Sequence, residues 1–224
     1  MRRKTTKKLV GGVLMLAMAA SAHSTVIEDW ESGAPRLFAF GPGFIDITFP
    51  TIPAISPENI PGLGRDNTAL AVDYNFVGTF GGVGQVFESG PQDWTDSNAL
   101  RFWMFGTETG NNLQFEIFDN SFDGTAANSE RFDTGLVDDF FGWQQMTINF
   151  DLLTRATDFQ PTGGLDDGLT LTEVYGYALV LDNAAGFLAF DEFERVNVPA
   201  PGEFALLGLG ILGMGLARRR SSAA

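Results

Sequence analysis

Short stretches of alternating hydrophobic and polar residues, separated by turn-forming residues, run through most of this 224-residue chain. In one of them Leu113, Phe115 and Ile117 alternate with Gln114 and Glu116. Side chains two positions apart share one face of a strand, so this pattern predicts half-buried β-strands rather than helices. Comparable stretches predict strands at residues 26–31, 37–40, 44–49, 69–76, 83–88, 99–105, 131–134, 145–150, 175–181 and 187–196.

The segments between these strands are rich in Gly, Pro, Asn and Asp, as at residues 41–43, 50–67, 106–112 and 161–168. Many short strands with such connections predict an all-β fold, an antiparallel β-sandwich. Residues 23–198 suffice for one such domain, and their 20 Phe can fill its core. The side chains expected to face inward include Phe102, Met104, Phe115, Ile117, Ile148 and Phe150.

The charge of this segment limits its partners. Residues 23–198 contain 27 acidic residues but only six basic ones, all Arg. Such a surface repels a phosphate backbone, which excludes nucleic acid as a partner. It suits divalent cations or neutral glycans.

Several kinds of catalytic site are excluded by missing residue types. The chain has no Cys, its single His is His23, and every Lys lies between positions 4 and 8. There is therefore no thiol nucleophile, no Ser-His-Asp triad and no catalytic lysine in the body. A carboxylate pair is the remaining route to hydrolysis, but Glu116 and Asp119 are three residues apart and should point to opposite faces of a strand. We predict no catalytic residues; a glycoside hydrolase or lyase is the less favoured alternative.

The N-terminus has the three parts of a secretory signal. Residues 1–8 are basic, residues 9–20 are apolar, and Ala20-Ser21-Ala22 fits a small-residue cleavage site. Residues 1–22 are therefore expected to be a signal peptide, with an uncleaved membrane anchor as the alternative. The apolar run is shorter than the roughly 20 residues of a spanning helix, which favours cleavage and export.

The C-terminus, residues 199–224, has a second distinctive order. Pro199-Ala200-Pro201 precedes a Gly- and Leu-rich apolar segment, and Arg218-Arg219-Arg220 follows it. The apolar segment is expected to be a short hydrophobic helix that enters the inner membrane, with the Arg residues on the cytoplasmic side. A simple tail anchor is the alternative.

This order resembles the PEP-CTERM sorting domain of Gram-negative bacteria, although Ala200 stands where Glu is usual. The resemblance implies recognition and cleavage by an exosortase, often in cells that make exopolysaccharide. The expected location is then the cell surface or the extracellular matrix.

One strand offers a candidate ligand-binding face. Arg101 and Trp103 alternate with the expected core residues Phe102 and Met104, so one of the two sets must point away from the core. If the outer set is Arg101 and Trp103, an aromatic ring beside a polar group suits the face of a sugar. The alternative is a strand covered on both faces by loops.

An acidic loop is a candidate cation site. Asp119, Ser121, Asp123 and Glu130 occupy positions 1, 3, 5 and 12 of a calcium-loop pattern, with Gly124 at the sharp turn. The flanking segments look like strands rather than EF-hand helices. An acidic hairpin loop without metal is the alternative.

The first and last strands carry a second resemblance. The opening Trp-Glu-Ser-Gly at residues 30–33, the Trp-Gln at 143–144 and the closing Phe-Asp-Glu-Phe at 190–193 are similar to galactose-binding-like jelly rolls, nearest to carbohydrate-binding modules related to family 11. This resemblance implies a jelly-roll sandwich at residues 23–198. It also implies a structural calcium held by the opening Glu31 and the closing Asp191.

Together these observations predict an exported, exosortase-sorted surface protein with a non-catalytic, polysaccharide-binding β-sandwich stabilised by Ca²⁺. The alternative is a structural or adhesive matrix protein without a specific glycan site.

Overall fold

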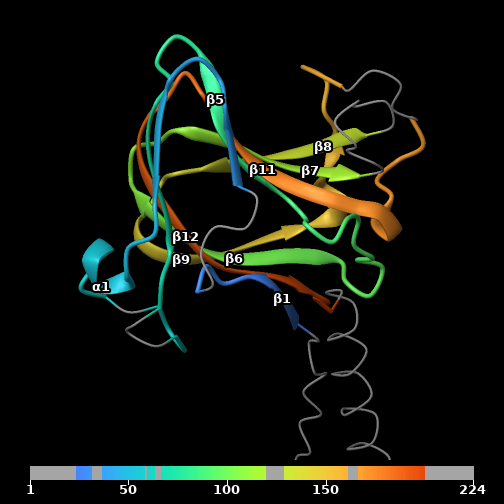
Figure 1. Cartoon of the computed structure of the whole chain (residues 1–224), viewed down its shortest axis with the longest axis horizontal. Helices are drawn as coiled ribbons and strands as arrows, with labels where there is room; N and C mark the ends of the chain where they lie inside the picture. The colour runs from blue at the N-terminus through green and yellow to red at the C-terminus, as the bar shows by residue number, and fades with distance from the viewer. Residues whose placement is uncertain are drawn as a thin grey trace, which may run out of the picture.

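The computed structural model describes residues 24–31, 37–58, 60–63, 67–119, 129–160 and 166–199. Two antiparallel sheets pack face to face in these residues, which confirms the predicted all-β sandwich (Figure 1). The predicted signal peptide, Ala200, Pro201, Arg218, Arg219, Arg220, Ser121 and Asp123 lie outside the described residues. Within the described part, no helix is long and apolar enough to cross a membrane.

The first sheet, sheet A, has the order β3-β4-β12-β6-β9, and β1 also pairs with β12. Its strands are β1 (Ser24–Glu28), β3 (Phe44–Thr48), β4 (Leu70–Asn75), β6 (Ala99–Thr107), β9 (Phe141–Asn149) and β12 (Ala185–Val196). A short helix, α1 (Ile52–Ile55), lies in the connection between β3 and β4.

The second sheet, sheet B, has the order β10-β8-β7-β11-β5-β2. Its strands are β2 (Leu37–Phe40), β5 (Phe80–Val86), β7 (Asn112–Asp119), β8 (Glu130–Val137), β10 (Thr154–Arg155) and β11 (Val174–Asp182). Two 3₁₀ turns lie in the connections: η1 (Phe150–Leu152) follows β9, and η2 (Leu171–Glu173) precedes β11. The sequence pattern predicted every strand except the two-residue β10, with ends displaced by up to a few residues.

The core lies between the inner faces of the two sheets. The residues predicted to face inward all belong to one buried cluster: Phe102, Met104, Phe115, Ile117, Ile148 and Phe150. The Phe102 and Phe193 rings stack 4.7 Å apart, and Tyr177 from the opposite sheet stacks on Phe193 at 4.9 Å. Because period-2 alternation places these rings inside, the intervening residues of each strand lie on the two outer faces.

Candidate functional site

Rows of directly paired residues cross the outer face of sheet B. One row runs from Phe38 on β2 through Gly84 on β5, Ala178 on β11 and Glu116 on β7 to Asp133 on β8. The neighbouring row has the order Phe40, Gly82, Val180, Gln114 and Gly135. Paired residues in antiparallel strands share a face. The face therefore has aromatic rings at one margin, small side chains in the middle and polar groups at the other margin.

The two Phe rings at the β2 margin lie over glycines. A Cβ at Gly84 would come within 2.5 Å of the Phe38 ring, and a Cβ at Gly82 within 2.8 Å of the Phe40 ring. The missing side chains thus make room for the rings to lie against the sheet. The Phe38 and Phe40 centroids are 6.0 Å apart with an interplanar angle of 35°, and both residues are half-buried. Together the rings form a small aromatic platform.

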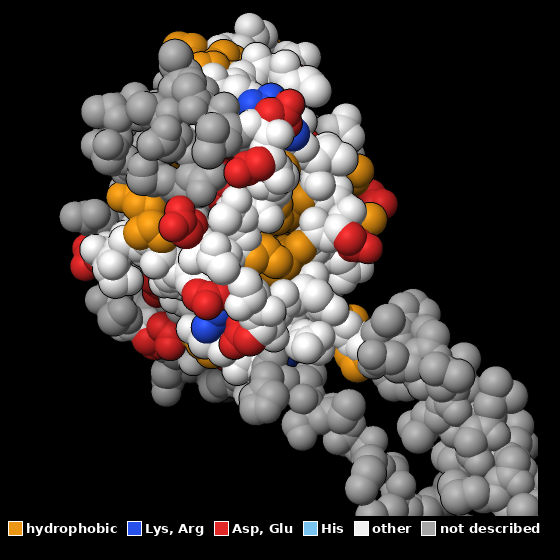
Figure 2. Space-filling view, turned by 90° about the vertical axis from the view of Figure 1, so that its right-hand side faces the viewer, with side chains coloured by type: hydrophobic (Ala, Val, Ile, Leu, Met, Phe, Trp, Pro, Cys, Tyr) orange, Lys and Arg blue, Asp and Glu red, His pale blue; other side chains and the backbone are white. Residues whose placement is uncertain are grey.

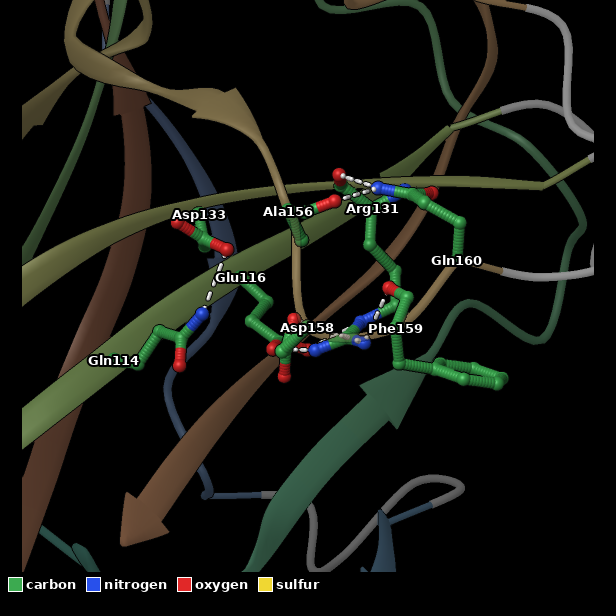
Figure 3. Close-up of polar contacts among 8 residues, drawn as sticks. All are labelled: Gln114, Glu116, Arg131, Asp133, Ala156, Asp158, Phe159 and Gln160. Atoms are coloured by element: carbon green, nitrogen blue, oxygen red, sulfur yellow. Dashed lines mark hydrogen bonds and ion pairs between the residues drawn. The ribbon is translucent and has the colours of Figure 1, made fainter.

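The polar margin is held in place by side-chain hydrogen bonds (Figure 3). Gln114 Nε2 donates to Asp133 Oδ2 at 2.6 Å, and both residues are half-buried. Beside them the guanidinium of Arg131 bonds both carboxylate oxygens of Glu116 through Nε and Nη2. Glu116 is only 2% exposed, so this ion pair is buried. Burial raises the pKa of Glu116, while the adjacent Arg131 opposes that rise.

Residues 158–160 tie the same arginine to a neighbouring loop. Arg131 Nη1 donates to the Phe159 carbonyl oxygen at 2.7 Å and lies 3.7 Å from Asp158 Oδ1. Gln160 accepts from the Arg131 main-chain N–H at 3.0 Å and donates to its carbonyl oxygen at 2.8 Å. The Phe159 ring is 61% exposed, with the guanidinium 5.4 Å from its centroid. A third aromatic ring therefore borders the polar margin.

The surface of the sandwich is predominantly acidic. Figure 2 shows the side on the right of Figure 1, where carboxylates are spread widely, basic groups occupy few places and hydrophobic side chains gather near the centre. At the polar margin of sheet B, the carboxylates of Glu116 and Asp158 lie near the guanidinium of Arg131, and Asp133 bonds Gln114. Such a surface disfavours anionic ligands and leaves neutral ones unopposed.

The predicted ligand residues Trp103 and Arg101 lie on the outer face of sheet A, opposite in direction to Phe102 and Met104. Trp103 is half-buried and packs with Ile52, Ile60 and Ala69 from the segment that carries α1. Arg101 Nε bonds Glu194 Oε1 at 2.6 Å. A role for Trp103 and Arg101 in ligand binding stays a prediction, and the α1 segment packs against the Trp103 side of this face.

Glu31 and Asp191 flank the residues Asn67 and Thr68. Glu31 Oε1 accepts from the Thr68 N–H at 2.5 Å, and Asp191 Oδ2 lies 3.5 Å from Asn67 Nδ2. Asp191 is fully buried without a cationic partner among these contacts, and burial raises its pKa to about 7, with Glu192 and Glu31 adding to the rise. A hard cation would relieve this buried charge, so the two carboxylates fit the predicted calcium.

The residues next to these carboxylates have unusual backbone conformations. Trp30 has φ 61° and Glu192 has φ 47°, the left-handed region that non-glycine residues rarely adopt. The Glu192 N–H donates to Asp191 Oδ1 at 2.7 Å. Backbone strain of this kind gathers at ligand-holding positions.

The ends of the predicted calcium loop, Asp119 and Glu130, are paired directly across β7 and β8. Both are fully buried, and burial, with the nearby Glu130 and Asp167, raises the pKa of Asp119 to about 6. In the described residues no three acidic, His or Cys side chains form a metal-binding group by themselves. A cation at either carboxylate pair would therefore also need hydroxyl, main-chain or water oxygens.

Sequence reasoning missed Phe38, Phe40, Gln114, Asp133 and Phe159 as candidate ligand residues. The available signal was the run of glycines at 81, 82 and 84, of which only Gly84 lies in the predicted strand 83–88; glycines in a strand mark close approach of another group. The pairing of β2 with β5 decides which rings cover these glycines. That register is set by the tertiary structure, so the local sequence does not predict it.

A comparison with protein families matches residues 17–197 to the family described as carbohydrate binding domain (family 11). A comparison with curated protein sequences gives no match.

Solved structures show the same architecture. A family 11 carbohydrate-binding module from Clostridium thermocellum, in complex with a β-1,3-1,4-mixed-linked tetrasaccharide, superposes with a TM-score of 0.62 at 17% identity, covering 78% of this chain and 96% of the module. The family 11 module of the cellulosomal cellulase Lic26A-Cel5E of the same organism gives 0.61 at 17% identity, covering 80% and 97%. An exo-β-agarase gives 0.53 at 16% identity over 79% of this chain and 25% of the agarase. At these identities the likeness shows the fold.

Proposed function

Since the chain belongs to the family 11 carbohydrate-binding domains, we propose that it binds a neutral polysaccharide on the outer face of sheet B without cleaving it. The observation that carries the proposal is the platform of Phe38 and Phe40 facing the Gln114–Asp133 pair across a floor of small residues. The C–H groups of a sugar stack on aromatic rings, while its hydroxyls bond to amide and carboxylate oxygens.

Binding without hydrolysis is supported by the carboxylate positions on β7. Glu116 lies on the outer face and is neutralised by Arg131, whereas Asp119 is fully buried and bonds the Thr170 and Glu130 main chain. As the sequence predicted, these two carboxylates do not face one substrate. A glycosidase needs a pair of carboxyl groups flanking one bond.

Gel affinity electrophoresis tests the proposed function. We expect neutral polysaccharides to retard the full chain, and mixed-linked β-1,3-1,4-glucan is the first probe because it is the type of ligand in the solved family 11 complex. An acidic polysaccharide of similar size should give little retardation, because the polar margin is itself acidic. Failure of every glycan, the host's own exopolysaccharide included, would leave only a structural matrix role.

We also propose that the chain is exported and sorted through its two ends. The support is the sequence order of residues 1–22 and 199–224, which resembles a signal peptide and an exosortase-recognised tail. The intact mass of the mature protein, recovered from the cell surface, should lack both segments. A full-length chain recovered from the cytosol would contradict this part of the proposal.

A structural Ca²⁺ held by Glu31 and Asp191 completes the proposal. Its support is the burial of Asp191 and the approach of both carboxylates to the Asn67-Thr68 segment. The ion would join the first and last parts of the domain, which otherwise tend to fray.

The raised pKa of Asp191 predicts a pH effect on stability in the presence of chelator. The folded state holds this proton more tightly than the unfolded state, so the free energy of unfolding should fall as pH rises from about 4 to about 7. Asp191→Asn should remove this part of the slope, whereas Asp73→Asn, an exposed position on the same sheet, should not. Urea denaturation between these pH values measures the change of the free energy of unfolding with pH. If this change is the same in both variants, it does not come from Asp191.

A further inference from the structure

The strand β9 forms one edge of sheet A, and its free edge has no neighbouring strand in the described part of the chain. β9 pairs with β6 alone, in nine consecutive pairs from Ala99–Asn149 to Thr107–Phe141. In an antiparallel pair, alternate residues bond the neighbouring strand, and the N–H and C=O groups of the intervening residues point away from it. Within the described residues, these outward groups of β9 have no protein hydrogen-bond partner.

The β9 edge lacks the features by which proteins prevent an edge strand from pairing with another chain. Those features are shortness, charged residues, Pro and β-bulges. β9 has nine residues, none of them charged and none Pro, and its register with β6 is unbroken. The other described edge strands are protected. β3 has five residues and carries Asp46, β1 has five and carries Glu28 beside a register shift, and β2 and β10 have only four and two.

The absence of charge on β9 indicates which partner fits this edge. Residues 23–198 contain 27 acidic residues and only six basic ones, so two copies of the domain repel each other over most of their surfaces. Along β9 the exposed side chains include Gln144, Gln145 and Thr147, which are polar but uncharged. A second copy can therefore pair here without placing like charges opposite each other, whereas a basic strand from another protein would find no carboxylate on β9.

We propose that two copies of this chain pair antiparallel through β9, about a two-fold axis perpendicular to sheet A. The pairing joins the two copies of sheet A into one continuous sheet through residues 143–149 of each copy. A Cβ at Gly142 would lie 3.7 Å from Glu58 Oε2, so the segment after α1 approaches the start of β9, and the pairing leaves out residues 141–142. Because both copies use the same edge, the assembly closes as a dimer.

The dimer would also orient the two candidate glycan faces. A two-fold axis perpendicular to the joined sheet keeps both copies of sheet B on the same side of it. The two outer faces of sheet B, each with its platform of Phe38 and Phe40, then point in the same direction. Two such faces on one dimer can bind the same polysaccharide, which raises the apparent affinity without any new sugar contact. This consequence rests on the proposed function, whereas the pairing of β9 does not.

Sedimentation velocity of the full chain over a range of concentrations tests the pairing. We expect a monomer–dimer equilibrium that shifts toward the dimer as salt rises, because salt screens the repulsion between the acidic domains. The β9 variant, Gln145→Glu/Thr147→Glu, puts carboxylates on both paired strands and should raise the dimer dissociation constant at least about tenfold. The control variant, Thr48→Glu/Thr154→Glu, adds the same charge at exposed positions of β3 and β10 and should associate like the wild type.

Amide hydrogen exchange of the wild type is the second measurement, and it does not depend on the folding of any variant. Alternate amides of residues 143–149 should become protected as the dimer forms, while the amides of β3 exchange as in the monomer. The proposal is overturned if the wild type stays monomeric up to about 1 mM. It is also overturned if the β9 variant associates as strongly as the control variant, or if the amides of β9 exchange equally fast in monomer and dimer.

Gel affinity electrophoresis separates the pairing from the glycan proposal. A neutral polysaccharide should retard the β9 variant less than the control variant, because a monomer presents one face instead of two. Equal retardation of a monomeric β9 variant and a dimeric control would show that the two faces do not act together. Replacing Phe38 and Phe40 with Ala should remove retardation and leave the dimer intact. A wild type that dimerises but binds no glycan would remove the proposed function and leave the pairing supported.

Discussion

Replacing Phe38 and Phe40 together with Ala is expected to abolish retardation of the chain by a neutral polysaccharide, with an affinity loss of at least about 100-fold. The two rings form the aromatic platform at the β2 margin of sheet B. Central aromatic anchors account for most of the binding energy at recognition sites, and a 100-fold loss corresponds to about 2.7 kcal/mol.

The fold should survive this double replacement. Phe38 and Phe40 lie on the outer face and are absent from the buried core cluster. The matched control is Phe141→Ala, which removes a ring that is 76% exposed on the opposite sheet. In affinity electrophoresis the polysaccharide should retard the control variant as strongly as the wild type. Equal loss in both variants would indicate a general surface effect, and unchanged binding of the double variant would move the glycan site away from β2.

The second large effect is expected from Arg131→Met, which should destabilise the domain by about 3 to 5 kcal/mol at neutral pH. The replacement leaves the carboxylate of Glu116 buried at 2% exposure without its cation. It also removes the link to the Phe159 carbonyl oxygen. Urea denaturation of the wild type and the variant measures the difference.

The pH dependence of this loss distinguishes a buried charge from lost packing. Burial raises the pKa of Glu116 even in the presence of Arg131, so without the arginine its proton should be held more tightly still. The destabilisation should therefore shrink as pH falls, because the carboxyl group is then neutral. The double variant Glu116→Gln/Arg131→Met should recover part of the loss at neutral pH. A pH-independent loss that the double variant does not recover would contradict this account of the pair.

The strands could be predicted from sequence because the alternation of side chains directly reflects which face is buried. Residues 37–40 coincide with β2, and the predicted inward set around Phe102 and Phe115 forms the core. β10 was missed because two residues, Thr154 and Arg155, carry no period. The alternation also indicated that Glu116 and Asp119 point to opposite faces, as they do.

The candidate glycan face could not be predicted in the same way. In the sequence, nothing distinguishes Phe38 and Phe40 from other strand residues. Their rings lie over Gly82 and Gly84 because of the register between β2 and β5, which the sequence pattern does not give. The alternation predicts Trp103 as a ligand-binding residue because it places a large ring on an outer face. The long connection between β3 and β4 folds back on that ring through Ile52 and Ile60, a contact that no local pattern encodes.

Two different kinds of information predict the candidate cation residues. Glu31 and Asp191 came from a resemblance, and the structure brings both to the Asn67-Thr68 segment. Asp119 and Glu130 came from loop spacing, and the register of β7 with β8 places them side by side. The unpartnered oxygen of Glu130 is visible only once its burial is known.

Amide chemical-shift mapping of the full chain with a mixed-linked β-glucan oligosaccharide tests the central claim most directly. The account predicts perturbations at β2, β5, β11 and β7, centred on Phe38, Gly84, Ala178 and Gln114, with the outer face of sheet A unaffected. Perturbations confined to β6 and β9 around Trp103 would contradict the account. So would the absence of perturbations with a neutral glycan that does retard the chain.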